Sequence, residues 1–161
     1  MDESQQYTLD RAHRHFAQSI NGDVWELLGR GSRTPGENER MIHAAHASLH
    51  HWLMIGGPVN HQRGEWLCAH VYTVLGHAEP ALRHAERCME LTELHRVDMK
   101  DFDLAYASEG LARAQALAGL KESASVHYRK AEVLGNAIAD DEDRSIFVGD
   151  LQGGEWHGVV E

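Results

Sequence analysis

Histidines in one short stretch are the residues of this sequence with the clearest capacity for chemistry. The segment MIHAAHASLHHW, residues 41–52, holds several of the 13 histidines of the chain. His43, His46 and His50 are spaced by three and then four residues, so a helix would place the three imidazoles on one side. Neutral imidazole is a common zinc ligand in helical sites. One interpretation is therefore a metal-binding helical protein that holds zinc through these three residues.

The same histidines also fit a helix that binds no metal. An apolar stripe at helical spacing runs through the segment and consists of Ile42, Ala45, Leu49, Trp52 and Leu53. Each of the three histidines follows a stripe residue by one place, about 100° around the helix from the core face. An imidazole has an apolar body and a polar tip, which suits such a flank. The segment also lacks the glutamate of H-E-x-x-H, the general base of that zinc motif. We favour packing without a cofactor and keep zinc as the alternative.

Other patterns typical of catalysis are absent or weak. The chain has no G-x-S-x-G and no glycine-rich phosphate loop. Its cysteines, Cys68 and Cys88, lie within helical patterns, and we expect them to be reduced, buried thiols of a cytoplasmic protein. The sequence assigns no catalytic residue. Enzyme activity stays open, and we favour a protein that is not an enzyme.

Charge and hydropathy narrow the range of partners. The formal net charge is −10, from 25 acidic and 15 basic side chains. An acidic surface repels phosphate backbones, so we expect no nucleic-acid partner. No apolar run is long enough for a membrane helix, and the acidic start MDESQQYTLD does not resemble a secretory signal. We therefore expect a cytoplasmic protein without a membrane partner.

Helical periodicity dominates the chain, and no alternating strand pattern is present. We predict an all-α domain over residues 1–151, with about 6–7 helices, and a flexible glycine-rich tail over 152–161. A break or weak point at residues 21–23 interrupts the first helical pattern. The predicted helical segments are 5–20 with a continuation through VWELLG, then a helix ending near 54, then 58–75, 79–94, 102–118, 121–138 and a short last helix through DRSIFVGDL.

Two of the predicted helical hairpins share one pattern of large and small residues. Gly76 and Gly119 each end the first helix of a hairpin. Residues at equal distances from the two glycines correspond, and small residues recur where two helices would cross. The corresponding pairs include Cys68 and Leu111, Ala69 and Ala112, Ala81 and Ala124, and Leu91 and Leu134.

This pattern resembles the tetratricopeptide repeat, whose signature is W-x2-L-G-x2-Y followed by A-x3-F and a terminal proline. In the first hairpin the matching positions are Glu65, Cys68, Ala69, Tyr72, Ala81 and Ala85. In the second they are Ser108, Leu111, Ala112, Gln115, Ala124 and Tyr128. Trp66 lies one place past the signature tryptophan, no proline follows either hairpin, and the repeat interval of 43 residues exceeds the usual one of about 34. The resemblance covers about residues 60–138, and the whole chain is similar to small bacterial proteins grouped only as tetratricopeptide-like.

The resemblance implies a short right-handed solenoid of stacked antiparallel hairpins. In such a solenoid the first helix of each hairpin lines a concave surface that binds a protein or peptide. In this chain, residues that share a side of the two lining helices are Trp66, His70, Tyr106, Glu109 and Arg113. We expect these residues to form a binding groove, and the alternative is that they are merely exposed residues on the helix surfaces. We also expect homo-oligomers such as a homodimer, because a short solenoid must cover its apolar ends.

Overall fold

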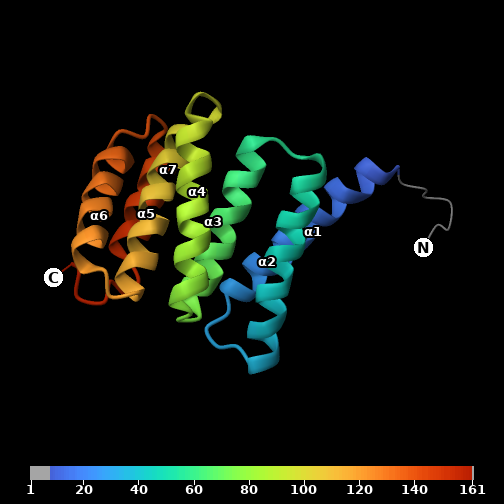
Figure 1. Cartoon of the computed structure of the whole chain (residues 1–161), viewed down its shortest axis with the longest axis horizontal. Coiled ribbons are helices and arrows are strands. Elements are labelled where there is room, and N and C mark those ends of the chain that lie inside the picture. The colour runs from blue at the N-terminus through green and yellow to red at the C-terminus, as the bar shows by residue number, and fades with distance from the viewer. Residues whose placement is uncertain (1–7, 161) are drawn as a thin grey trace.

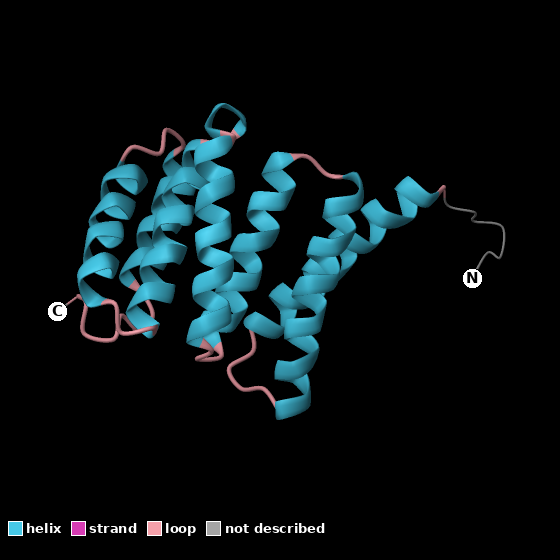
Figure 2. Cartoon of the chain, viewed as in Figure 1, coloured by secondary structure: helices cyan, strands magenta, loops and turns pink. Residues whose placement is uncertain are grey.

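The computed structural model describes residues 8–160, and every regular element in that range is helical (Figures 1 and 2). Seven α-helices and one 3₁₀ turn occur in this part of the chain, with no strand. The elements are α1 (Leu9–Leu28), α2 (Pro35–Ile55), α3 (Pro58–Val74), α4 (Ala78–Leu94), η1 (Arg96–Asp98), α5 (Asp101–Leu117), α6 (Lys121–Asn136) and α7 (Asp141–Gln152). The all-α fold class predicted from the sequence is confirmed.

The helices form consecutive hairpins that stand side by side. α1 packs mainly on α2, α3 on α4, and α5 on α6, and contacts of α2 with α3, α4 with α5, and α3 with α5 join the hairpins. α7 packs on α5 and α6 after the last hairpin. Figure 1 shows this row with the two ends of the chain at opposite ends of the molecule. Because α3 and α5 are direct neighbours, side chains on their adjoining faces can meet.

The turns after α3 and α5 have the same geometry. Gly76 and Gly119 have φ angles of +77° and +79°, a conformation that glycine adopts without a steric penalty. The amide of His77 donates to the carbonyl of Tyr72 at 2.9 Å, and that of Leu120 donates to Gln115 at 2.8 Å. These are the long hydrogen bonds of a Schellman turn. The two glycines aligned in the sequence therefore end their helices in the same way.

α1 is a single continuous helix, and residues 21–23 do not break it. Thr8 caps its start by accepting a hydrogen bond from the amide of Arg11. Gly22 lies inside it, and a Cβ built at that position would meet nothing within 4 Å. The unbroken helix places Trp25 beside α3, with its ring centroid 6.1 Å from that of Trp66.

Small residues fill the places where helices cross. Ala81 and Ala124 are fully buried, as predicted, because a small side chain lets two helices approach closely. The apolar stripe of α2 is only partly buried. Its residues Ala45 and Leu49 lie in the core formed with α1 and α3, whereas Leu53, which belongs to the same predicted stripe, is 54% exposed.

The segment after α7 differs from the flexible tail expected from its glycines. Trp156 is buried, and its indole nitrogen donates to the carbonyl of Leu151 at 3.0 Å. Its ring meets Tyr128 of α6 edge to face at 4.8 Å. Gly154 and Gly158 both have positive φ angles that let the chain turn around this anchor. The prediction missed the anchor because nothing in the local sequence indicates what Trp156 packs against.

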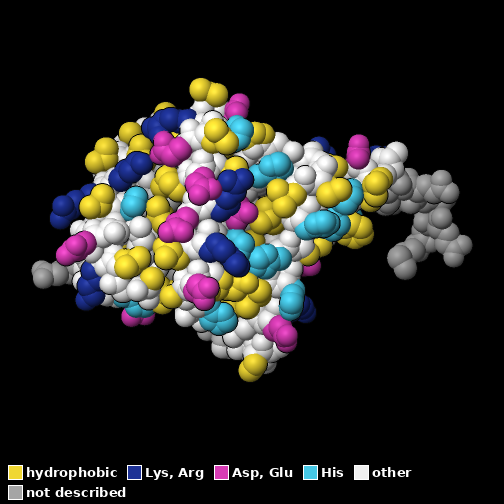
Figure 3. Space-filling model, viewed as in Figure 1, with side chains coloured by type: hydrophobic (Ala, Val, Ile, Leu, Met, Phe, Trp, Pro, Cys, Tyr) yellow, Lys and Arg dark blue, Asp and Glu magenta, His cyan; other side chains and the backbone are white. Residues whose placement is uncertain are grey.

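Charged side chains are mixed on the face shown in Figure 3. Lys and Arg alternate with Asp and Glu over the middle of the row, and histidines lie mainly toward its N-terminal half. Within residues 8–160, no helix has the length and apolar character needed to cross a membrane.

Candidate binding groove

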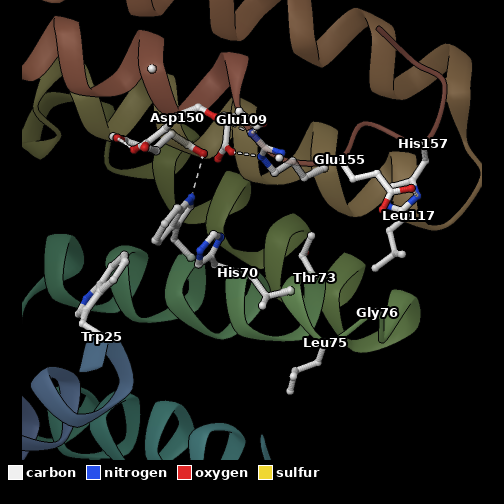
Figure 4. Close-up of a pocket in the computed structure, with 17 residues that line it drawn as sticks. Trp25, His70, Thr73, Leu75, Gly76, Glu109, Leu117, Asp150, Glu155 and His157 are labelled. Atoms are coloured by element: carbon white, nitrogen blue, oxygen red, sulfur yellow. Dashed lines mark hydrogen bonds and ion pairs between the residues drawn. The ribbon is translucent and has the colours of Figure 1, made fainter. Parts of the chain in front are cut away.

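The five residues predicted to line a groove lie around one cavity of about 610 Å³. They are Trp66 and His70 of α3 with Tyr106, Glu109 and Arg113 of α5. Figure 4 shows His70 and Thr73 on one side of this cavity and Glu109 on the other. The structure thus brings together residues of α3 and α5 that are about 40 positions apart in the chain.

Three further parts of the chain complete the cavity and were not predicted to do so. Trp25 comes from α1, Asp150 comes from α7, and the segment 153–157 forms an outer wall. Figure 4 shows Glu155 and His157 at the end of the cavity where this segment lies. No sequence pattern links these residues to α3 or α5, because only the packing of α1 and α7 brings them there.

A hydrogen bond holds Trp66 against α5, and the lack of a side chain at Gly110 lets the indole approach that helix closely. Its indole nitrogen donates to the carbonyl of Tyr106 at 3.1 Å. A Cβ at Gly110 would lie 3.0 Å from that nitrogen, so the glycine leaves room for the indole to approach the helix. His70 stacks on Trp66 with a centroid distance of 4.8 Å and an interplanar angle of 11°. The two rings form a rigid aromatic wall.

Arg113 joins α5 to α7 and to the segment that follows. It forms an ion pair with Glu109 one turn earlier, and both side chains are largely buried. Nη2 of the same guanidinium donates to the carbonyls of Asp150 at 2.7 Å and Gly153 at 2.9 Å. The guanidinium also lies 4.1 Å from the ring centre of Trp156, a cation–π contact. The charge of Arg113 is therefore committed to contacts within the protein.

Glu109 is a buried carboxylate with only one of its two oxygens paired. Oε2 is buried and has no hydrogen-bond partner among the described residues. Burial raises the pKa of Glu109, although the adjacent Arg113 guanidinium opposes the shift. Leaving a buried carboxylate oxygen without a hydrogen bond costs free energy of folding. Buried groups with shifted pKa values are concentrated at functional sites.

His70 contributes an aromatic ring to the cavity and no positive charge near neutral pH. Burial, reinforced by the nearby Arg113 charge, lowers the pKa of His70 to about 4. Asp150 acts in the opposite direction and does not reverse the shift. At pH 7 the imidazole is neutral.

A second cavity of about 490 Å³ adjoins the first. The two share Trp25, Trp66, Tyr106 and Asp150 as a common boundary. The second is the more apolar of the two, with Leu67, Phe102 and Ile146 in its walls. We call the two cavities together the groove.

Polar groups in the second cavity are also paired. Arg63 binds Asp103 through two hydrogen bonds of 2.8 and 3.0 Å, and Asp103 is buried. At the boundary between the cavities the Tyr106 hydroxyl donates to Oδ2 of Asp150 at 2.5 Å. Burial and this carboxylate together raise the pKa of Tyr106, so the phenol stays protonated and holds Asp150 in place.

Two of the three histidines proposed as zinc ligands, His46 and His50, make different contacts. Nε2 of His46 lies 3.0 Å from the Tyr72 hydroxyl, and its ring is 5.0 Å from that of His84. The ring of His50 instead contacts His51, at 5.6 Å between centroids. Among residues 8–160, no group of three or more His, Cys, Asp or Glu side chains has an arrangement that would hold a metal ion.

His46 belongs to a polar cluster between α2, α3 and α4. In this cluster Nδ1 of His84 lies 2.6 Å from Oε2 of Glu65, and the ring of His84 stacks on Tyr72 at 5.7 Å. Burial lowers the pKa of His46, and the neighbouring His84 adds to that effect. At His46 the flank position inferred from the helical wheel is thus used for packing between helices, whereas His43 and His50 are exposed.

Comparison with known proteins found no match to this chain among protein families, curated sequences or solved structures.

Proposed function

We propose that this protein is a peptide-binding helical-repeat module whose binding surface is the groove. The observation that carries the proposal is the shared boundary of the two cavities at Trp25, Trp66, Tyr106 and Asp150. Volumes of about 610 and 490 Å³ are within the range of ligand sites. Two adjoining cavities suit an extended chain that places successive side chains in each.

The composition of the groove supports binding more than catalysis. Its tryptophan and tyrosine rings offer large, rigid contact areas of the kind enriched at interfaces. Both arginines of the groove are bound to carboxylates of the same molecule, Arg63 to Asp103 and Arg113 to Glu109. These ion pairs position side chains. Neither has the form of a nucleophile activated by a base.

Selection from a random dodecamer peptide library tests this function. Enriched peptides would be measured by fluorescence polarisation against wild type and two variants of α1. Trp25 is 47% exposed and lines the groove, while Phe16 is 48% exposed and lies outside it. We expect Trp25→Ala to weaken binding by about tenfold or more, as hot-spot tryptophans do, and Phe16→Ala to leave it unchanged. Failure to enrich any peptide that depends on Trp25 would contradict the proposal.

A cytoplasmic location and self-association are further parts of this proposal. The unpaired, buried thiols of Cys68 and Cys88 support a reducing compartment. Leu53 and Met54 at the end of α2 are more than half exposed and offer an apolar area to a second copy. Light scattering at several protein concentrations measures the mass directly, and a monomer at every concentration would remove self-association from the proposal.

A further inference from the structure

More acidic than basic side chains line the groove, and the basic ones are already paired within the protein. Its carboxylates belong to Asp103, Glu109, Asp150 and Glu155, and its guanidinium groups to Arg63 and Arg113. Each guanidinium is already paired with a carboxylate, and Glu155 lies 3.3 Å from Nδ1 of His157, which also lines the groove. His70 is neutral near pH 7 because its pKa is about 4. The groove therefore presents excess negative charge to a ligand.

Asp150 is the carboxylate of the groove best placed to bind a positively charged group of a ligand. It borders both cavities, and it is exposed. Oδ2 accepts the Tyr106 hydroxyl, and no Lys, Arg or His within residues 8–160 forms an ion pair with its carboxylate. Figure 4 shows Asp150 on the same side of the cavity as Glu109. Glu109 lines the same cavity with its Oε2 unpaired, while its charge is paired with that of Arg113.

Aromatic rings surround the same position. Trp25, Trp66 and Tyr106 form the rest of the boundary between the cavities. The ring centroids of Trp66 and Tyr106 are 5.5 Å apart at a steep angle of 74°. The faces of such rings attract cations, and a carboxylate beside them strengthens the attraction. Carboxylate and rings together select a positively charged group.

We propose that the groove recognises a peptide by an arginine or lysine side chain seated at this boundary, between the Asp150 carboxylate and the rings of Trp25, Trp66 and Tyr106. The inference rests on the proposed function and specifies its ligand. The second cavity, with Leu67, Phe102 and Ile146, takes an apolar side chain near the basic one. This second contact makes a peptide, rather than a free amine, the occupant.

Three degenerate peptide libraries of equal length test the inference. They differ only in one fixed central residue, which is arginine, glutamine or glutamate, and all other positions exclude charged residues. Binders from each library would be measured against wild type, Asp150→Asn and Glu142→Gln. The asparagine keeps an oxygen for the Tyr106 hydroxyl, and Glu142 is an exposed acid of the same helix outside the groove.

We expect the arginine library to yield the tightest binders, weakened about tenfold or more by Asp150→Asn and unchanged by Glu142→Gln. Their affinity should also fall as salt rises from about 50 to 500 mM, a measurement that does not depend on the variant folding. Equally tight, Trp25-dependent binders from the glutamine or glutamate library would overturn the inference and leave the proposed function standing. Binding of agmatine as tight as that of the peptides would also overturn it. If no library gives Trp25-dependent binders, both proposals fail.

Discussion

The ring of Phe147 in α7 lies against the backbone of Gly135 in α6. A Cβ built on Gly135 would be 2.2 Å from Cε1 and 2.3 Å from Cδ1 of that ring, and Phe147 is fully buried. No Cβ can occupy that space, so the glycine sets how closely α7 approaches the last hairpin. Because α7 carries Asp150, this contact also positions one wall of the groove.

Gly135→Ala should therefore destabilise the protein, although alanine favours helix. Overpacking a buried ring costs about 1–3 kcal/mol, more than the gain of up to about 1 kcal/mol from replacing a helical glycine. Gly22→Ala in α1 is the matched control, because a Cβ there meets nothing within 4 Å, and it should stabilise. Chemical denaturation measures both changes. Equal effects of the two substitutions would show that Phe147 does not pack as described.

Ala124→Leu should destabilise by about 1–3 kcal/mol, because the fully buried Ala124 lies where α6 meets its neighbours. The neighbouring position 123 is exposed, so Ser123→Leu is a suitable control and should change the free energy of unfolding little. Thermal unfolding distinguishes the two variants. An unchanged melting temperature for Ala124→Leu would contradict the alignment of the two hairpins.

Cys68 and Cys88 should resist thiol reagents in the folded protein. Both are buried and unpaired, and burial raises the pKa of each to about 12, so almost no reactive thiolate exists at pH 8. Titration with an aromatic disulfide reagent should find no rapid reaction in native protein and two free thiols after denaturation. A count of zero in denatured, unreduced protein would indicate a disulfide and an oxidising compartment.

Stability should fall in acid partly because of His70. Its pKa is about 4 in the folded state, against an ordinary value of 6.5 for a free histidine side chain, so the unfolded chain binds more protons between these values. The free energy of unfolding therefore decreases as pH falls from about 6.5 to 4, by at most about 3 kcal/mol from this group. His70→Gln should show a flatter dependence over the same window. Superimposable curves for the two proteins would mean that His70 titrates normally.

Trp156→Ala should lower stability by about 3 kcal/mol or more, the usual cost of removing a buried tryptophan. The variant loses the ring contact with Tyr128, the cation–π contact with Arg113 and the hydrogen bond to Leu151. Val160→Ala, at the partly exposed end of the same segment, should have little effect. Denaturant unfolding compares the two. A negligible effect of Trp156→Ala would support the flexible tail that the sequence suggested.

The sequence by itself determined the helices and the pairing of the hairpins. Periodic apolar residues define helices locally, and Gly76 and Gly119 end two of them in the same left-handed turn. Local spacing also placed Tyr106, Glu109 and Arg113 on one side of α5, because residues three and four apart are neighbours on a helix. Such information lies within one or two turns of chain and can be read without a structure.

Only the tertiary structure decided what faces those side chains. Trp25 and Asp150 enter the groove from α1 and α7, and Trp156 is buried against α6, because helices distant in sequence pack together. Helix packing also places His46 against Tyr72 and His84, while His50 contacts only its neighbour His51 among the ring contacts described. A helical wheel gives the direction of a side chain from its own axis. The partner it meets depends on the angle and distance of the neighbouring helix, which many weak contacts set together.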